Sequence, residues 1–137
     1  MSKFQIAKKL LIIFTLFIYS CSKSSPSNTT PPAETRLTFT INPDPGTTVL
    51  SALGSSQDFS ITVTSPLPAA GITVSTSAVK ELDGSSVFSQ SLTSNLTNFT
   101  SSVQNLQNGV VCNVTITLTS RSSSSNTVSK TFKLARK

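Results

Sequence analysis

The sequence predicts an all-β domain, a single antiparallel β-sandwich of about seven strands, and three features of the chain support this prediction. From residue 36 onward, apolar and polar residues alternate with a period of two over most of the chain, as they do in strands with one buried face. Clusters of Pro, Gly, Asn and Asp interrupt the alternation at regular intervals, as turns do. No helical repeat follows the first 20 residues. We therefore expect two antiparallel sheets packed face to face.

The first three expected strands are separated by breaks that contain proline and glycine. Residues 36–41, 58–64 and 72–82 alternate in the strand pattern, and the breaks between them hold Asn42-Pro-Asp-Pro-Gly46 and Pro66-Leu-Pro-Ala-Ala-Gly71. Proline cannot donate to a strand ladder, and glycine permits turn geometry, so each break should end a strand.

Four further strands are expected in the second half of the chain. Asp83-Gly84 and Asn108-Gly109 are tight-turn signals, and the strands between and after them are expected at 87–92, 98–103, 110–120 and 127–135. The strand at 110–120 has the clearest alternation. Its apolar face includes Cys112, so we expect this cysteine to be a core residue, as free cysteines commonly are.

The segment before that strand resembles a corner of known β-sandwiches. Leu106, Gly109, Val114 and Ile116 match the pattern Leu-x-x-Gly-x-x-Tyr-x-Val-x-Val of fibronectin type III and related immunoglobulin-like domains. Cys112 stands where those families have tyrosine, and the chain has no tryptophan. The resemblance implies an immunoglobulin-like β-sandwich over residues 36–137.

The N-terminal segment has the parts of a secretory signal. Three lysines and no acid lie in the first nine residues, an apolar run covers 10–19, and Ser20-Cys21 follows. The run is shorter than the roughly 20 apolar residues that span a bilayer. Ile18-Tyr19-Ser20-Cys21 resembles the lipobox of bacterial lipoproteins, although Tyr19 departs from the usual small residue. The resemblance implies a signal peptide at 1–20, cleavage before Cys21, and lipid on the Cys21 thiol and amino group. In the alternative, an ordinary secreted protein has a cysteine near the cut by chance.

Residues 21–35 are expected to link the lipid to the domain. After Cys21 this segment is rich in Ser, Thr and Pro and has no large apolar residue, so it cannot offset its ordering entropy and should be a disordered tether. Ser22 is not the aspartate that retains enteric lipoproteins in the inner membrane, which favours the outer membrane. Lys23-Ser-Ser-Pro lacks the acidic residues common after the cysteine in surface lipoproteins of Bacteroidota-like bacteria, which favours an orientation toward the periplasm.

The charge of the chain does not predict a nucleic-acid partner. The formal net charge is +6, but three of the eleven basic residues precede the expected cut, leaving eight against five acids. The basic residues near the C-terminus lack the interleaved aromatics of a nucleic-acid surface. Lysines on edge strands commonly discourage sheet-to-sheet pairing, and we expect that role here.

The sequence predicts no catalytic residue, no metal site and no cofactor. The chain has no histidine, so it lacks the commonest general base and metal ligand. Glu81 and Asp83 lie close together, but beside a turn signal, where acids commonly serve turn geometry. Asp44 and Asp83 lie in loops without calcium-ligand spacing.

Two functions of different classes remain, and neither is enzymatic. The first is a membrane-anchored binding or adhesion module for a protein or glycan partner, with binding residues that the sequence does not identify. The second is an accessory subunit that docks on an envelope complex through a strand edge. A glycan site is disfavoured because sugars stack mostly on Trp or Tyr, whereas the domain's aromatics are five phenylalanines: Phe39, Phe59, Phe88, Phe99 and Phe132.

Overall fold

Eight strands and no helix make up residues 33–137, the part of the chain that the computed structural model describes. The expected signal peptide at 1–20, the expected lipid attachment at Cys21 and all but the last three residues of the expected tether lie outside this part. The strands are β1 (Phe39–Asn42), β2 (Leu50–Ala52), β3 (Gln57–Val63), β4 (Ile72–Lys80), β5 (Ser86–Ser94), β6 (Asn98–Val103), β7 (Val111–Ser120) and β8 (Thr127–Arg136).

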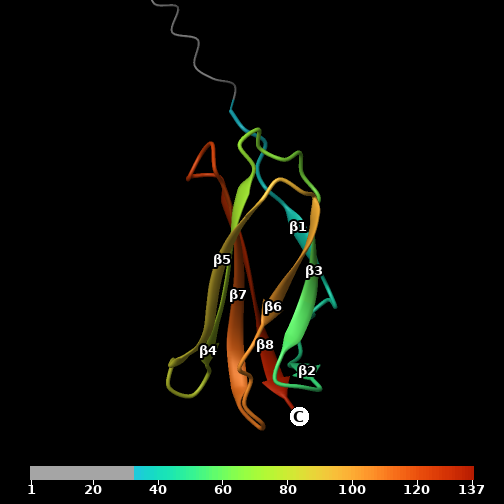
Figure 1. Ribbon diagram of the computed structural model, residues 1–137, viewed down its shortest axis with the longest axis vertical. Helices are drawn as coiled ribbons and strands as arrows, with labels where there is room; N and C mark the ends of the chain where they lie inside the picture. The colour runs from blue at the N-terminus through green and yellow to red at the C-terminus, as the bar shows by residue number, and fades with distance from the viewer. Residues whose placement is uncertain (1–32) are drawn as a thin grey trace, which may run out of the picture. The chain divides into compact units, whose positions relative to one another are not determined.

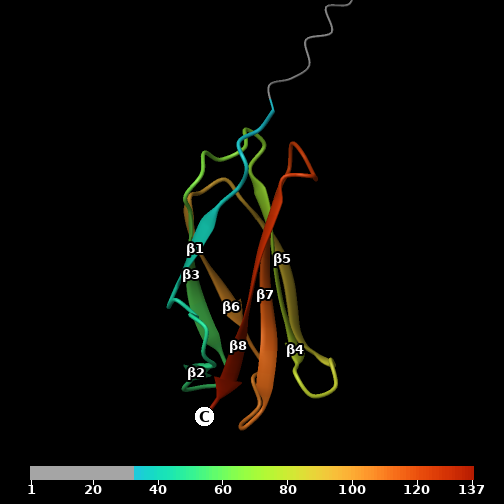
Figure 2. The same cartoon turned by 180° about the vertical axis from the view of Figure 1, so that it is seen from behind.

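The strands form two sheets that face each other (Figure 1). One sheet has three strands in the order β1-β3-β6, and the other has five in the order β2-β8-β7-β4-β5. The chain changes sheet five times between β1 and β8, so strands that follow one another in sequence often lie in different layers, as the reverse view also shows (Figure 2). The prediction of an all-β sandwich is confirmed.

The structure contains one strand, β2, that the sequence did not predict, and this strand runs parallel to its neighbour. β2 was not expected, and it pairs parallel to β8, with Leu50 opposite Leu134; every other strand pair in the two sheets is antiparallel. A strand of three residues is too short to show a period of two. It can pair in parallel because β2 and β8 are far apart in the sequence, so no tight turn has to join them.

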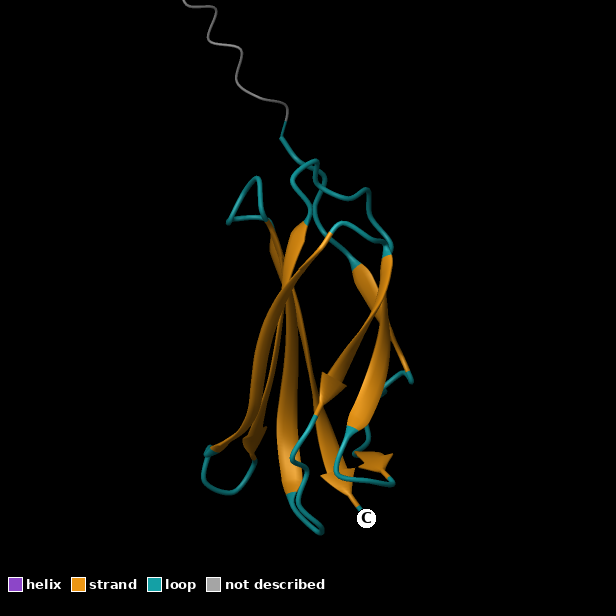
Figure 3. Cartoon of the chain, in the orientation of Figure 1, coloured by secondary structure: helices purple, strands orange, loops and turns teal. Residues whose placement is uncertain are grey.

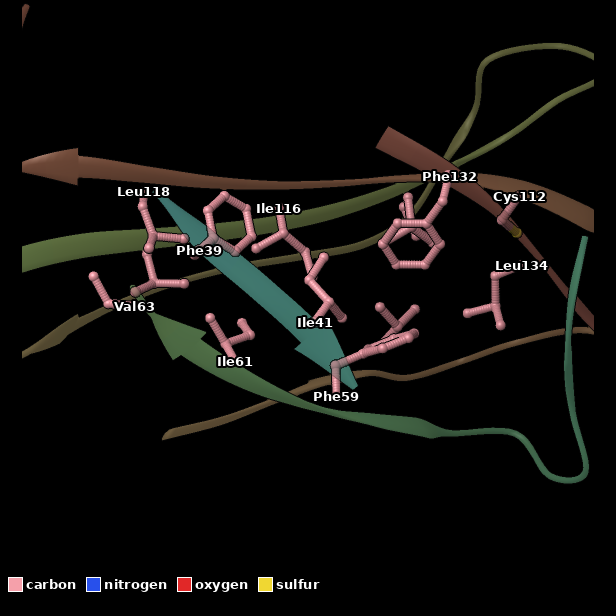
Figure 4. Packing of buried hydrophobic residues seen from close by; sticks show 14 of the residues in the cluster. Phe39, Ile41, Phe59, Ile61, Val63, Cys112, Ile116, Leu118, Phe132 and Leu134 are labelled. Carbon is pink, nitrogen blue, oxygen red and sulfur yellow. The ribbon is translucent and has the colours of Figure 1, made fainter. Parts of the chain in front are cut away.

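Alternating residues of both sheets build the core. β7 shows this most clearly, since every second residue from Cys112 to Ser120 is buried, and Cys112 is fully buried as predicted. Phe59 of β3 and Phe132 of β8 meet edge to face, with ring centroids 5.1 Å apart (Figure 4). A buried hydrogen bond of 2.8 Å joins the hydroxyls of Thr76 and Ser101, and so links the two sheets.

Residues 33–137 contain a complete core. The buried apolar residues extend from Leu37 to Leu134 and come from both sheets, and residues 33–137 form one compact unit. A domain of this size can bury enough apolar surface to fold by itself.

The outer side of the five-stranded sheet is covered by hydroxyl groups. Three hydroxyl pairs join β7 to β8 across the ladder, at 2.7–3.0 Å: Thr115–Thr131, Thr117–Ser129 and Thr119–Thr127. Cross-strand threonine pairs stabilise a solvated sheet face modestly. β5 adds Ser89 and Ser91 to the same side, because they pair with Ser77 and Ser75 of β4.

Candidate functional site

Most loops of the sandwich gather at two ends, and the loop at 43–49 lies along the side (Figure 3). Ala33 and the loops at 64–71, 95–97 and 121–126 lie at one end, which we call the N-terminal end. The loops at 53–56, 81–85 and 104–110, together with Lys137, lie at the opposite end, which we call the far end.

Asn126 attaches the entering chain at the N-terminal end. Its Oδ1 accepts a hydrogen bond of 2.9 Å from the backbone N–H of Leu37, and its Nδ2 donates to the Thr35 carbonyl at 3.0 Å and to Glu34 Oε2 at 3.1 Å. Hydrogen bonds from Ser120 and Asn126 lower the pKa of the Glu34 carboxyl below its ordinary value, because they favour the charged form. The side chain of Asn126 therefore holds the backbone that enters the domain against the loop at 121–126.

A pocket of about 620 Å³ opens at the far end. The turn between β4 and β5 lines one side of it, with Leu82 and the backbone around it. Val110 and Val111, at the start of β7, line the other side. Binding pockets for small ligands or protruding side chains commonly have this size and a mostly apolar lining with a few polar groups. We take this pocket as the candidate binding site.

Two leucines at the far end are almost fully exposed. Leu82 has a relative exposure of 97% and Leu53 of 92%, and both lie in short loops beside strands of the five-stranded sheet. Single exposed leucines are common, but Leu82 also lines the pocket. The sequence prediction extended the third strand to residue 82, whereas β4 ends at Lys80 and the turn leaves Leu82 in solvent.

The two carboxylates at the rim of the pocket are engaged in local structure. Glu81 forms an ion pair with Lys133 of β8, and Asp83 Oδ1 accepts a hydrogen bond of 2.9 Å from the backbone N–H of Ser85. Hydrogen bonds from Ser85 lower the pKa of Asp83 below its ordinary value. Asp83 therefore stabilises the turn, as its sequence context suggests, and the two carboxylates do not converge on a common partner.

The other acids of the domain also have structural partners. Asp44 Oδ1 accepts a hydrogen bond of 3.0 Å from the Gly46 N–H within its own turn, and Asp58 accepts one of 2.6 Å from the Ser102 hydroxyl across the β3–β6 ladder. Within residues 33–137, no three His, Cys, Asp or Glu side chains are placed to hold a metal ion.

Cys112 lies beneath the far end of the sheet, opposite Leu134 and Lys80 in the ladder. Burial raises the pKa of its thiol above the ordinary value, because the thiolate loses hydration. A thiol that is buried and held protonated is a poor nucleophile. The loop at 104–110 is joined to β8, since Arg136 Nη1 donates to the Leu106 carbonyl at 3.3 Å and the Gly109 N–H donates to the Arg136 carbonyl at 3.0 Å.

The phenylalanines contribute to packing. Phe39, Phe59 and Phe132 are buried, and Phe88 and Phe99 pack against the core from partly exposed positions. Lys130 lies over the Phe39 ring, 5.4 Å from its centroid.

Among the described residues, no helix has the length and hydropathy that a membrane crossing requires.

Comparison with protein-family models finds none that matches this chain, and comparison with curated proteins finds none that is significantly similar. The two facing sheets and the far-end pocket define the chain as a β-sandwich protein with a candidate binding site between loops.

Sequence reasoning did not identify Leu53, Leu82 or the pocket. One signal was available, because Leu82 is a large apolar residue inside the turn segment Glu81-Leu-Asp-Gly84. The pocket has no such signal, since its two sides come from residues 80–83 and 109–111, which only the pairing of β4 with β7 brings together.

Proposed function

We propose that this protein is a lipoprotein anchored in the outer membrane of the bacterial cell envelope, and that its immunoglobulin-like sandwich binds a partner without catalysis. The lipobox-like segment ending in Cys21 supports the anchor, and the corner at Leu106 supports the likeness to fibronectin type III domains. In this proposal lipid on Cys21 holds the chain to the membrane, and the tether joins it to the N-terminal end of the domain.

The observation that carries the binding function is the pocket at the far end, with Leu82 exposed at its rim. The chain enters the domain at the opposite end, where Asn126 holds it. A domain anchored in this way can turn its far end away from the membrane. We propose that a protein partner inserts an apolar side chain into the pocket against Leu82, Val110 and Val111.

Protease treatment of intact cells tests the anchor and the orientation. Lysed cells and a Cys21→Ser variant serve as controls. We expect the wild type to partition into detergent and the Cys21→Ser variant to remain unprocessed or to become soluble. Unchanged detergent partitioning of the variant would refute the lipid anchor. Digestion of the domain in intact cells would place it on the surface, and protection until lysis would place it in the periplasm.

Site-specific photocrosslinking tests the far-end pocket. A photoreactive amino acid at position 82 should give a discrete adduct with a protein partner in cells. The same group at Ser125, which is exposed at the N-terminal end, is the matched control. Equal adducts from both positions, or none from position 82, would argue against the far-end site.

A second candidate function is an accessory subunit that docks on an envelope complex through a strand edge. β5 is the last strand of the five-stranded sheet, and its outer edge, which no described strand covers, favours this function. Crosslinking from β5 to a different envelope protein, with none from position 82, would support this function over the first.

A further inference from the structure

β5 is a long edge strand with one irregularity, a register shift against β4 between Ala78 and Val79 that leaves Val87 without a partner in β4. It has nine residues, lies at the end of the five-stranded sheet, and within the described chain pairs only with β4. None of its residues is charged and none is proline. Native proteins commonly place lysine, proline or a covering segment at such an edge, because an open strand edge recruits another strand.

The opposite edge of the same sheet is protected. β2 covers the end of β8 at residues 134–136. Lys130 and Lys133 lie along the remainder of β8, as expected for lysines near the C-terminus. In the other sheet, the outer strands β1 and β6 have only four and six residues. The uncharged edge of β5 is thus the longest open edge that the described strands offer.

The sequence of β5 is nearly symmetric about its centre. It reads Ser-Val-Phe-Ser-Gln-Ser-Leu-Thr-Ser, with Gln90 in the middle. Antiparallel pairing of two such strands about Gln90 would place Phe88 opposite Leu92, and Ser89 opposite Ser91. Regular pairing is expected over residues 88–92, because the register of β5 against β4 shifts beside Val87. Within that span apolar residues would meet apolar residues and polar residues polar ones, and no pair would bring like charges together.

The side chains of β5 are placed to continue the core in such a pair. Phe88 and Leu92 stand opposite the buried residues Ala78 and Val74 of β4, so they share the inner side of the sheet. Both are only partly buried against the core. Pairing about Gln90 would bring Phe88 of one copy against Leu92 of the other, twice, and cross-strand aromatic–aliphatic pairs of this kind stabilise sheets.

We propose that two copies of this chain associate through β5, in an antiparallel pairing centred on Gln90 that makes one continuous sheet across both domains. The near symmetry of β5 favours a second copy over an unrelated strand, because a two-fold axis requires a strand that complements itself. A single strand pair is a small contact, so the association is reversible and depends on concentration.

If the lipid anchor proposed above is correct, the pairing has a consequence for how anchored copies meet. Antiparallel strands put the N-terminal ends of the two domains at opposite ends of the pair. Two copies that stand upright side by side on one membrane therefore cannot form it. The pairing itself does not depend on the anchor.

Disulfide trapping in the full chain tests the register. Residues directly opposite in antiparallel strands have Cα atoms about 4.5–5.5 Å apart, which suits a disulfide. We expect Gln90→Cys to give a covalent dimer under mild oxidation. Thr40→Cys is the matched control, since Thr40 is exposed on edge strand β1 of the other sheet and that variant retains Cys21 and Cys112. Equal trapping in both variants, or none at position 90, would overturn the proposal.

Introducing a charge at position 90, on the two-fold axis, tests whether the partner is a second copy. On residues 33–137, which contain their own core, Gln90→Lys and Gln90→Glu should each weaken self-association at least tenfold in analytical ultracentrifugation. Mixing the two variants should restore association, because Lys then faces Glu. A wild-type domain that stays monomeric at high concentration, or a mixture no better than either variant, would refute self-pairing. Because this experiment contains no lipid, a Cys21→Ser result against the anchor would leave its outcome unchanged.

Discussion

The two ends of the sandwich differ in how closely their loops are packed. At the N-terminal end, Asn126 binds the entering chain at Leu37 and Thr35, and Arg121 donates from its backbone and from its side chain to the carbonyls of Gly71 and Ala70. At the far end, the turn glycines Gly84 and Gly109 have no neighbouring atoms within 4 Å of an added Cβ. The difference teaches that the loops at the N-terminal end pack closely on one another, whereas the far-end turns are hydrogen-bonded to the strands but leave open space around their glycines.

Alanine at two glycines should show this difference most strongly. Gly71 has a φ of +79°, and an added Cβ would lie 1.8 Å from Asn95 Oδ1 and 2.7 Å from the Ser94 carbonyl. Gly71→Ala should therefore combine backbone strain with a clash and cost about 2–4 kcal/mol. Gly84 has a similar φ of +70° in open space, so Gly84→Ala should cost about 1 kcal/mol, from the backbone alone.

Urea denaturation of both variants measures this pair. Equal midpoints for Gly71→Ala and Gly84→Ala would show that the N-terminal end relaxes as easily as the far end, and would remove the basis of the comparison.

Removing the Asn126 side chain should have the next largest effect. Asn126→Ala leaves the Leu37 N–H and the Thr35 carbonyl without this partner, and lost hydrogen bonds of partly buried groups cost about 1–3 kcal/mol. Ser125→Ala changes a neighbouring exposed residue and should stay within about 0.5 kcal/mol of the wild type. Hydrogen exchange should show faster exchange at Leu37 in Asn126→Ala only. Unchanged exchange at Leu37 would mean that the hydrogen bonds of Asn126 do not order the segment at 35–37.

Acid should weaken both ends, each through one carboxylate. The folded-state pKa values of Glu34 and Asp83 are lowered, so their stabilising effect is present above the ordinary carboxyl pKa of about 4 and is lost as the pH falls through the lower folded-state values. Glu34→Gln and Asp83→Asn should each flatten the decline of the denaturation midpoint at acid pH. The effect is small because both groups are exposed to solvent. A decline as steep as that of the wild type in both variants would contradict this assignment.

The smallest expected effect on stability lies at Leu82. Because Leu82 is 97% exposed, Leu82→Ser should leave the free energy of unfolding within about 0.5 kcal/mol of the wild type. The same substitution should reduce crosslinking of a partner from the pocket rim, measured with a photoreactive group at Val110. A large loss of stability would mean that Leu82 packs in the domain, and the far end would then be closed like the other.

The positions of most strands could be predicted from the sequence, since strand period and burial are local properties. Residues 98–103 form β6 as expected, and β7 and β8 begin and end within one residue of the predicted bounds. Cys112 was placed in the core from its position in the alternation, and it is buried. Leu82 was misplaced because its own turn, not the alternation, decides where β4 ends.

The sequence by itself determined that the chain is all-β, where most of its strands run and which side of each of these strands faces the core, because a strand shows its two faces every second residue. Only the tertiary structure decided which strands lie side by side. The pairing of β2 with β8, the pocket between the turn at 81–85 and the start of β7, and the open edge of β5 all depend on it. These features join residues far apart in the chain, and no local pattern encodes which distant strands will meet.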